Sequence, residues 1–222
     1  MKKRLYGLIT LAFLPTISQL VVALFQNYGV GLIVRILTHI IIPVIAVMYF
    51  TKISLKESFL LPLHLKNKKQ VLKWALIWSL GAIIIILTAF FSLKHLIDLT
   101  AISSSLALIG VTPITYPFVA LAIVLINPFI EEYFWRGFVF RVFDKYTGKG
   151  YWTGILFAIH HVLIIALWFN WWQFLLVTGF LAIIGILFNW TYKKTDSIYA
   201  TLITHTVADI VIVTIGYFYI FS

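Results

Sequence analysis

The sequence predicts an all-α bundle of transmembrane helices, arranged as a single integral membrane domain over residues 1–222. Hydrophobic residues make up 62% of the chain and charged residues only 11%, and apolar runs of membrane-spanning length recur. A soluble domain carries about 25% charged residues, so this chain has too little polar surface to cover a core in water. There is no cysteine, which excludes disulfides, thiol catalysis and cysteine metal sites.

Seven apolar runs are long enough to cross about 30 Å of hydrocarbon as helices. The first follows Met1-Lys2-Lys3-Arg4 and is too long for the hydrophobic region of a signal peptide, so we expect it to be retained. The stretch 101–115 is moderately apolar and favours a short interfacial or re-entrant helix, which leaves an eighth span open. The expected spans are residues 5–26, 28–50, 71–93, 116–143, 151–168, 172–190 and 197–221.

Positive charges lie almost entirely on one side of this seven-helix arrangement. Fourteen of the 17 Lys and Arg residues fall at the N-terminus or in or beside the loops after the second, fourth and sixth spans. The opposite loops hold only Lys94, and Arg35 and Arg136 lie within spans. The positive-inside rule therefore predicts a cytoplasmic N-terminus and a C-terminus on the far side. These orientation signals account for the net charge of +10, and we expect no nucleic-acid partner.

Acidic and imidazole side chains occur inside the spans, where a charged group costs about 2.5–3.5 kcal/mol on insertion scales. Counted at about 1.5 Å per residue from the lysine-rich side, they lie roughly 14–20 Å deep on three different helices. This common depth indicates one site that opens most easily toward the cytoplasm. The residues are Glu131, Glu132, His160, His161, His205 and Asp209.

Three pairs of residues in these spans are four positions apart, so each pair shares a helix face. Glu132 and Arg136 fit an ion pair. In the second pair, the aromatic ring of Phe157 can brace the imidazole of His161. The third pair joins the imidazole of His205 to the carboxyl group of Asp209. Pro128 removes a helix hydrogen bond just before the glutamates, so we expect a kink there.

Purely structural interpretations stand beside the functional one. The first pair fits a structural ion pair, the third fits an interhelical hydrogen-bonding unit, and Glu131 alone suits a proton relay. We expect His160 to face another helix or lipid headgroups. Packing or interfacial roles are expected for three further polar residues, which are Arg35, His39 and His95.

The joint arrangement supports hydrolysis of a peptide bond within the membrane. A carboxylate and an imidazole within hydrogen-bond reach can hold and deprotonate a water molecule. Donors aimed at the developing oxyanion supply much of the acceleration. The His205 side chain can donate, and Asp209 can orient that imidazole or donate itself if protonated. Zinc is the alternative, because two histidines and a carboxylate are a plausible ligand set for a catalytic zinc.

The residues resemble the three motifs of the CPBP family, which comprises CAAX proteases and bacteriocin-processing enzymes once called Abi proteins. EExxxR is present as Glu131-Glu132-Tyr133-Phe134-Trp135-Arg136. FxxxH is present as Phe157-Ala158-Ile159-His160-His161, and HxxxN/D as His205-Thr206-Val207-Ala208-Asp209. The resemblance covers about residues 117–210, and the first three helices carry no motif.

The resemblance implies a glutamate-dependent intramembrane endopeptidase. By matching positions, Glu131 would be the general base, with His161 holding the water and His205 and Asp209 forming the oxyanion site. The FxxxH spacing selects His161 over His160, and Asp209 stands where many relatives have Asn. We favour a metal-free water and no cofactor. Supporting roles fall to Glu132, Arg136 and Phe157, and the zinc alternative would use Glu131, His161 and His205.

The resemblance also bears on substrate and location. Eukaryotic relatives trim the last three residues from prenylated CAAX proteins, whereas bacterial relatives are linked to bacteriocin immunity, peptide maturation or surface-protein processing. The composition looks bacterial, so we expect a multi-pass protein of the bacterial plasma membrane that acts on a membrane-associated peptide or protein. The alternatives are a non-catalytic immunity or scaffold protein of the same fold, and a small proton-coupled transporter. Intact motifs argue against the first, and the lack of repeated halves argues against the second.

Overall fold

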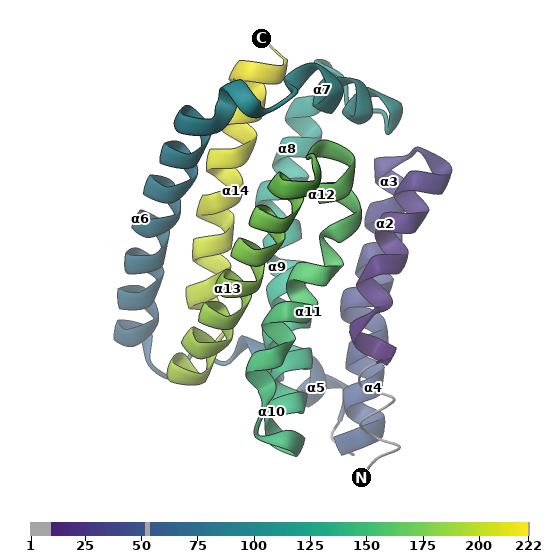
Figure 1. Cartoon of the computed structure of the whole chain (residues 1–222). Helices are drawn as coiled ribbons and strands as arrows, with labels where there is room; N and C mark the ends of the chain where they lie inside the picture. The colour runs from purple at the N-terminus through teal and green to yellow at the C-terminus, as the bar shows by residue number, and fades with distance from the viewer. Residues whose placement is uncertain (1–9, 52–53, 222) are drawn as a thin grey trace.

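The computed structural model describes residues 10–51 and 54–221, and this part of the chain consists of helices joined by short loops, without a strand (Figure 1). Five of its helices are long and apolar enough to cross a bilayer, and a bent pair, Gly150–His160 with Val162–Trp168, makes a sixth if it is one span. The predicted all-α, multi-pass architecture is therefore confirmed. The five are Tyr28–Tyr49, Lys68–Leu96, Tyr116–Lys145, Trp171–Thr195 and Tyr199–Ile220.

Six of the seven predicted spans coincide with these helices, and the first falls short. The predicted span 5–26 appears as an apolar helix over Thr10–Val22, which is too short to qualify as a span, and residues 5–9 lie outside the described part. The short helix expected within 101–115 is present as Leu99–Leu108. Its 10 residues rise only about 15 Å, so it adds no eighth span.

Two π-helical segments interrupt otherwise continuous rods: Leu37–Ile41 joins α3 to α4, and Tyr133–Phe140 joins α9 to α10. Such irregular turns are often found at functional sites. In chain order the α-helices are α2 (Leu14–Phe25), α3 (Tyr28–Ile36), α4 (Ile42–Thr51), α5 (Leu55–Leu60), α6 (Lys68–Leu93), α7 (Leu99–Leu108), α8 (Tyr116–Leu125), α9 (Asn127–Glu132), α10 (Arg141–Thr147), α11 (Thr153–His160), α12 (Val162–Trp168), α13 (Trp171–Thr195) and α14 (Tyr199–Ile220).

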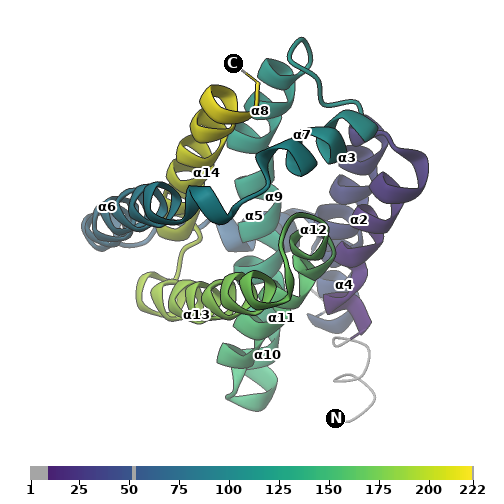
Figure 2. The same cartoon turned by 45° about the horizontal axis from the view of Figure 1, so that its top comes forward.

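The rod from α8 to α10 runs through the middle of the bundle, with α6 and α14 on one side and the α2–α3 hairpin on the other (Figures 1 and 2). Every residue from Ile130 to Phe140 is buried. By contrast, α6 exposes a long apolar face that includes Leu72, Leu76 and Leu80, as expected for a helix in contact with lipid. The predicted glutamates thus lie on the most enclosed helix of the protein.

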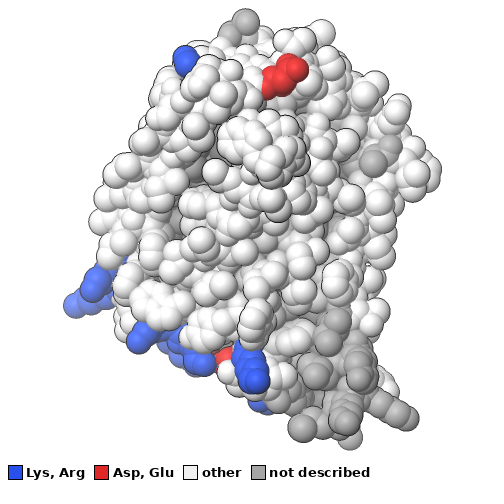
Figure 3. All heavy atoms as spheres, in the orientation of Figure 1, with Lys and Arg blue, Asp and Glu red and all other residues white. Residues whose placement is uncertain are grey.

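Basic side chains gather at the end of the bundle where α5 and α10 lie, away from the C-terminus (Figure 3). Two exposed ion pairs occur among them: Lys66 with Asp196, and Lys193 with Asp144. This distribution is the one on which the positive-inside prediction rests.

Two breaks shape the helices that carry the motifs. At the first, α8 ends at Leu125 and α9 begins at Asn127, immediately before Pro128, as the proline predicts. At the second, the chain bends by 40° between α11 and α12, and His161 is the residue between them. No proline lies between Thr153 and Trp168, so the sequence held no signal for this bend.

Glycines let α11 pack directly against α13. A Cβ atom added at Gly185 would lie 2.5 Å from the carbonyl oxygen of Gly154 and 2.8 Å from its Cα. Small residues at such crossings allow the backbones of transmembrane helices to touch. This contact sets the position of α11, whose C-terminal end carries the paired histidines.

We therefore expect Gly185→Ala to destabilise the protein by about 1–3 kcal/mol, because the added methyl group must push two backbones apart. Gly179→Ala on the same helix is the matched control, since its Cβ would meet nothing within 4 Å. Thermal unfolding in detergent measures both variants. Equal unfolding temperatures for the two would contradict the close contact.

Candidate active site

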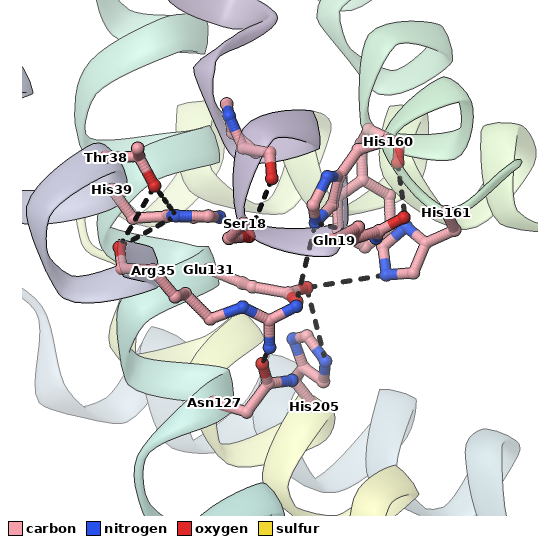
Figure 4. A network of polar contacts seen from close by, with 12 residues as sticks. Ser18, Gln19, Arg35, Thr38, His39, Asn127, Glu131, His160, His161 and His205 are labelled. Atoms are coloured by element: carbon pink, nitrogen blue, oxygen red, sulfur yellow. Dashed lines mark hydrogen bonds and ion pairs between the residues drawn. The ribbon is translucent and has the colours of Figure 1, made fainter. Parts of the chain in front are cut away.

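The carboxylate of Glu131 lies at the meeting point of the three motif-bearing segments (Figure 4). Its side chain is 1% exposed. Its Oε2 atom lies 3.7 Å from Nε2 of His161 and 3.9 Å from Nε2 of His205. The structure thus brings together residues from α9, the α11–α12 bend and α14, as their common depth predicted.

His161 is oriented by its own helix. Its Nδ1 lies 2.9 Å from the carbonyl oxygen of Phe157, which can only accept, so Nδ1 carries the proton and donates it. The Phe157 ring also packs edge-on against the imidazole, with ring centroids 4.8 Å apart. Nε2 is therefore the nitrogen that faces Glu131.

His205 is oriented by a residue that the sequence analysis did not connect to it. Its Nδ1 donates to Oε1 of Glu132 at 3.0 Å, across two helices. Its Nε2 lies 3.8 Å from Oδ1 of Asp209, which is too long for a direct hydrogen bond. The orienting partner is thus Glu132 and not Asp209, while Asp209 stands beside Nε2.

The predicted ion pair between Glu132 and Arg136 is present and fully enclosed. Arg136 Nη1 donates to Oε1 of Glu132 at 2.9 Å, and both side chains are 0% exposed. The guanidinium also stacks between the rings of Phe157 and Phe188, at 4.6 and 5.0 Å from their centroids. The same Oε1 accepts from His205, so a hydrogen bond connects this buried pair to the candidate site.

On its other side, Glu131 meets residues that were expected only to pack. Arg35 Nη2 lies 3.6 Å from Oε1 of Glu131, and Arg35 Nη1 donates to Oδ1 of Asn127. His160 also faces inward, with Nε2 4.0 Å from the same Oε1. A single arginine within an apolar run was the only signal in the sequence that could have pointed to Arg35.

The distances around Oε2 of Glu131 suit one bridging water molecule. This atom is buried and has no hydrogen-bond partner among the described residues, and the same is true of Oδ2 of Asp209. Separations of 3.7–3.9 Å are too long for direct hydrogen bonds but short enough for one water to contact both sides. The arrangement can therefore hold a water between a carboxylate and an imidazole.

A metal ion has a partial fit. Ligand atoms of Glu131, His160 and His161 lie within 4.8 Å of one another. Zinc accepts both carboxylate oxygens and imidazole nitrogens as ligands. This group contains His160 in place of His205, which belongs to the zinc set predicted from the sequence. However, the Arg35 guanidinium beside Oε1 places a positive charge next to one of the ligands.

A cavity of about 640 Å³ lies toward the basic end of the bundle and is separate from this site. Its lining includes Val44, Leu60, Phe138 and Arg141, but none of the predicted catalytic residues. Some neighbours of Glu131 are partly exposed. Of these, the side chain of His161 is 21% exposed and that of Arg35 is 19% exposed.

Comparison with known proteins agrees with the motifs. Residues 113–211 match a family described as type II CAAX prenyl endopeptidase, Rce1-like. The match contains all three motifs and nearly coincides with the predicted motif-bearing region, 117–210. It confirms the resemblance for this stretch. No curated protein and no solved structure matches the chain.

Proposed function

Taking residues 113–211 as an Rce1-like CAAX endopeptidase segment, we propose that the protein hydrolyses a peptide bond of a membrane-associated peptide or protein. Its nucleophile is a water molecule activated by Glu131 and His161. The observation that carries this proposal is the buried, unpaired Oε2 of Glu131, which faces Nε2 of His161 at 3.7 Å. A water in that gap donates one hydrogen to each of these atoms.

In the first step, the water oxygen attacks the peptide carbonyl carbon while one water proton passes to Oε2 of Glu131. The carbonyl oxygen becomes an oxyanion. In the second step, the C–N bond breaks and Glu131 returns the proton to the leaving amine. Burial excludes competing water and strengthens each electrostatic contact along this path.

The oxyanion is stabilised from the side of α14. His205 donates from Nδ1 to Glu132, so it can also donate from Nε2 only as an imidazolium. The carboxyl groups of Glu131, Glu132 and Asp209 surround the ring and balance that charge. Asp209, if protonated, supplies a second donor at the same place.

We place the basic end of the bundle in the cytoplasm of a bacterial cell, with the substrate held in or on the plasma membrane. The site lies among apolar helices, so a substrate must itself be anchored in the membrane to reach it. A membrane-anchored peptide of bacterial origin fits this setting without a prenyl group.

The test is cleavage, by purified protein in detergent, of a library of acyl-anchored peptides and of prenylated peptides, followed by mass spectrometry. We expect cleavage of acyl-anchored peptides by the wild type and none by Glu131→Gln. Cleavage of prenylated peptides alone would correct the substrate class. Equal cleavage by wild type and Glu131→Gln would remove Glu131 from the mechanism, whereas no cleavage of either peptide class by the wild type would favour a non-catalytic scaffold.

The same assay tests metal dependence. We expect cleavage to be unchanged after prolonged chelation, because Arg35 places a positive charge 3.6 Å from Oε1 of Glu131 and so disfavours a divalent cation there. Loss of cleavage on chelation, with recovery on adding zinc, would instead favour a catalytic zinc, for which Glu131, His160 and His161 are the candidate ligands.

A further inference from the structure

The α2–α3 hairpin lies outside residues 113–211 and carries none of the motifs, yet its side chains reach the candidate site (Figure 4). Arg35 Nη2 lies 3.6 Å from Oε1 of Glu131. Gln19 Nε2 lies 3.5 Å from Nε2 of His160, and the His39 ring packs edge-on against the His160 ring at 5.6 Å. The hairpin therefore forms one wall of the site.

Arg35 is held in place at both ends. Its backbone carbonyl accepts from Nδ1 of His39, in the π-helical segment that follows α3, at 3.0 Å. Its guanidinium donates from Nη1 to Asn127 and faces Glu131 with Nη2. Asn127 and Glu131 are four residues apart on one face of α9, so the guanidinium bridges two successive turns of that helix.

The two oxygens of Glu131 consequently have different surroundings. Oε1 faces Arg35 and His160, whereas Oε2 faces His161 and His205 and has no direct hydrogen-bond partner among the described residues. Without Arg35, the plane of the carboxylate is free to turn about its last torsion, and neither oxygen is then held toward His161 and His205. With Arg35 on one oxygen, the other stays directed at the position of the attacking water.

We propose that Arg35 is a positioning residue, which holds Oε1 of Glu131 so that Oε2 serves as the base. This inference rests on the proposed peptidase function and deepens it, because it makes the N-terminal hairpin a working part of the site. It also predicts that the motif-bearing segment is incomplete without that hairpin.

Kinetics separate positioning from a merely structural role. We expect Arg35→Gln to lower kcat on a cleaved acyl-anchored peptide by about 100-fold, because small misplacements of a reacting group have effects of that size, with KM little changed. Arg35→Lys restores a cation and should recover most of kcat. Arg141→Gln is the matched control, since that guanidinium contacts the carbonyl of Leu61 away from the site, and it should behave as wild type.

A second measurement needs no substrate. The infrared spectrum of wild type minus that of Glu131→Gln isolates the carboxylate bands of Glu131. We expect the antisymmetric carboxylate band to shift in Arg35→Gln, to return toward its wild-type position in Arg35→Lys, and to stay unchanged in Arg141→Gln. This readout stays informative for folded protein of low activity, and thermal unfolding in detergent identifies any variant that fails to fold.

The outcomes distinguish this inference from the function on which it rests. An unshifted carboxylate band, or wild-type kcat in Arg35→Gln while Glu131→Gln is inactive, would overturn the role of Arg35 and leave the peptidase standing. Full cleavage by Glu131→Gln would overturn the glutamate mechanism itself, and no cleavage by the wild type would overturn the peptidase. A shifted band with a reduced kcat that lysine restores would support both.

Discussion

Glu131→Gln is expected to lower kcat for peptide cleavage by about 10²- to 10⁴-fold, the range associated with loss of a general base. The amide has nearly the same shape as the carboxylate, so the packing of this 1% exposed side chain is kept. The glutamine amide cannot accept the water proton at pH 7. In the proposed mechanism, Glu131 accepts this proton in the first step. The measurement is kcat for cleavage of an acyl-anchored peptide in detergent, compared between wild type and Glu131→Gln.

Glu57→Gln is the matched control, because Glu57 is the one other glutamate outside the motif pair. It lies at the basic end, where its carboxylate accepts from the backbone nitrogen and the hydroxyl of Ser54 at the start of α5. These hydrogen bonds lower the pKa of Glu57, so it is ionised at neutral pH and its replacement weakens only a local cap. Similar losses of activity in both glutamine variants would argue against a specific role for Glu131.

Arg136→Leu is expected to destabilise the protein by about 3–5 kcal/mol, because it leaves the carboxylate of Glu132 buried without its cation. Glu132 would keep only its hydrogen bond from His205, so the orientation of that ring would suffer as well. The unfolding temperature in detergent should fall sharply, and cleavage should fall with it.

Lys193→Leu provides the comparison for this second prediction. Lys193 pairs with Asp144 at 3.0 Å, but its side chain is 49% exposed, and exposed ion pairs contribute about 0–1 kcal/mol. Adding Glu132→Gln to Arg136→Leu should recover part of the lost stability, since no uncompensated charge then remains. If Arg136→Leu were as mild as Lys193→Leu, the pair would not be buried as the structure places it.

The local features of the candidate site were predictable from the sequence. Spacing along one helix brought Glu132 to Arg136 and Phe157 to His161, and Pro128 marked the break before α9. These predictions succeed because they depend only on the geometry of a single helix. The residue roles themselves remain proposals that the experiments above test.

Contacts between helices were harder to predict. The hydrogen bond from His205 to Glu132 joins residues 73 positions apart, and His160 proved to face the same carboxylate as His161. The bend at His161 occurs without a proline in the sequence from Thr153 to Trp168, so it could not be predicted. Each of these features depends on how one helix is rotated against another.

The amino-acid sequence by itself determined the all-α class, six of the seven predicted spans and the charge asymmetry between the ends of the bundle. A bilayer requires each spanning segment to satisfy its own backbone hydrogen bonds, so composition and run length suffice for these features. Only the tertiary structure decided that Arg35 faces Glu131 and that Glu132 orients His205. In lipid, the outward and inward faces of a helix are both apolar, so hydropathy does not reveal which face turns inward to meet its neighbours.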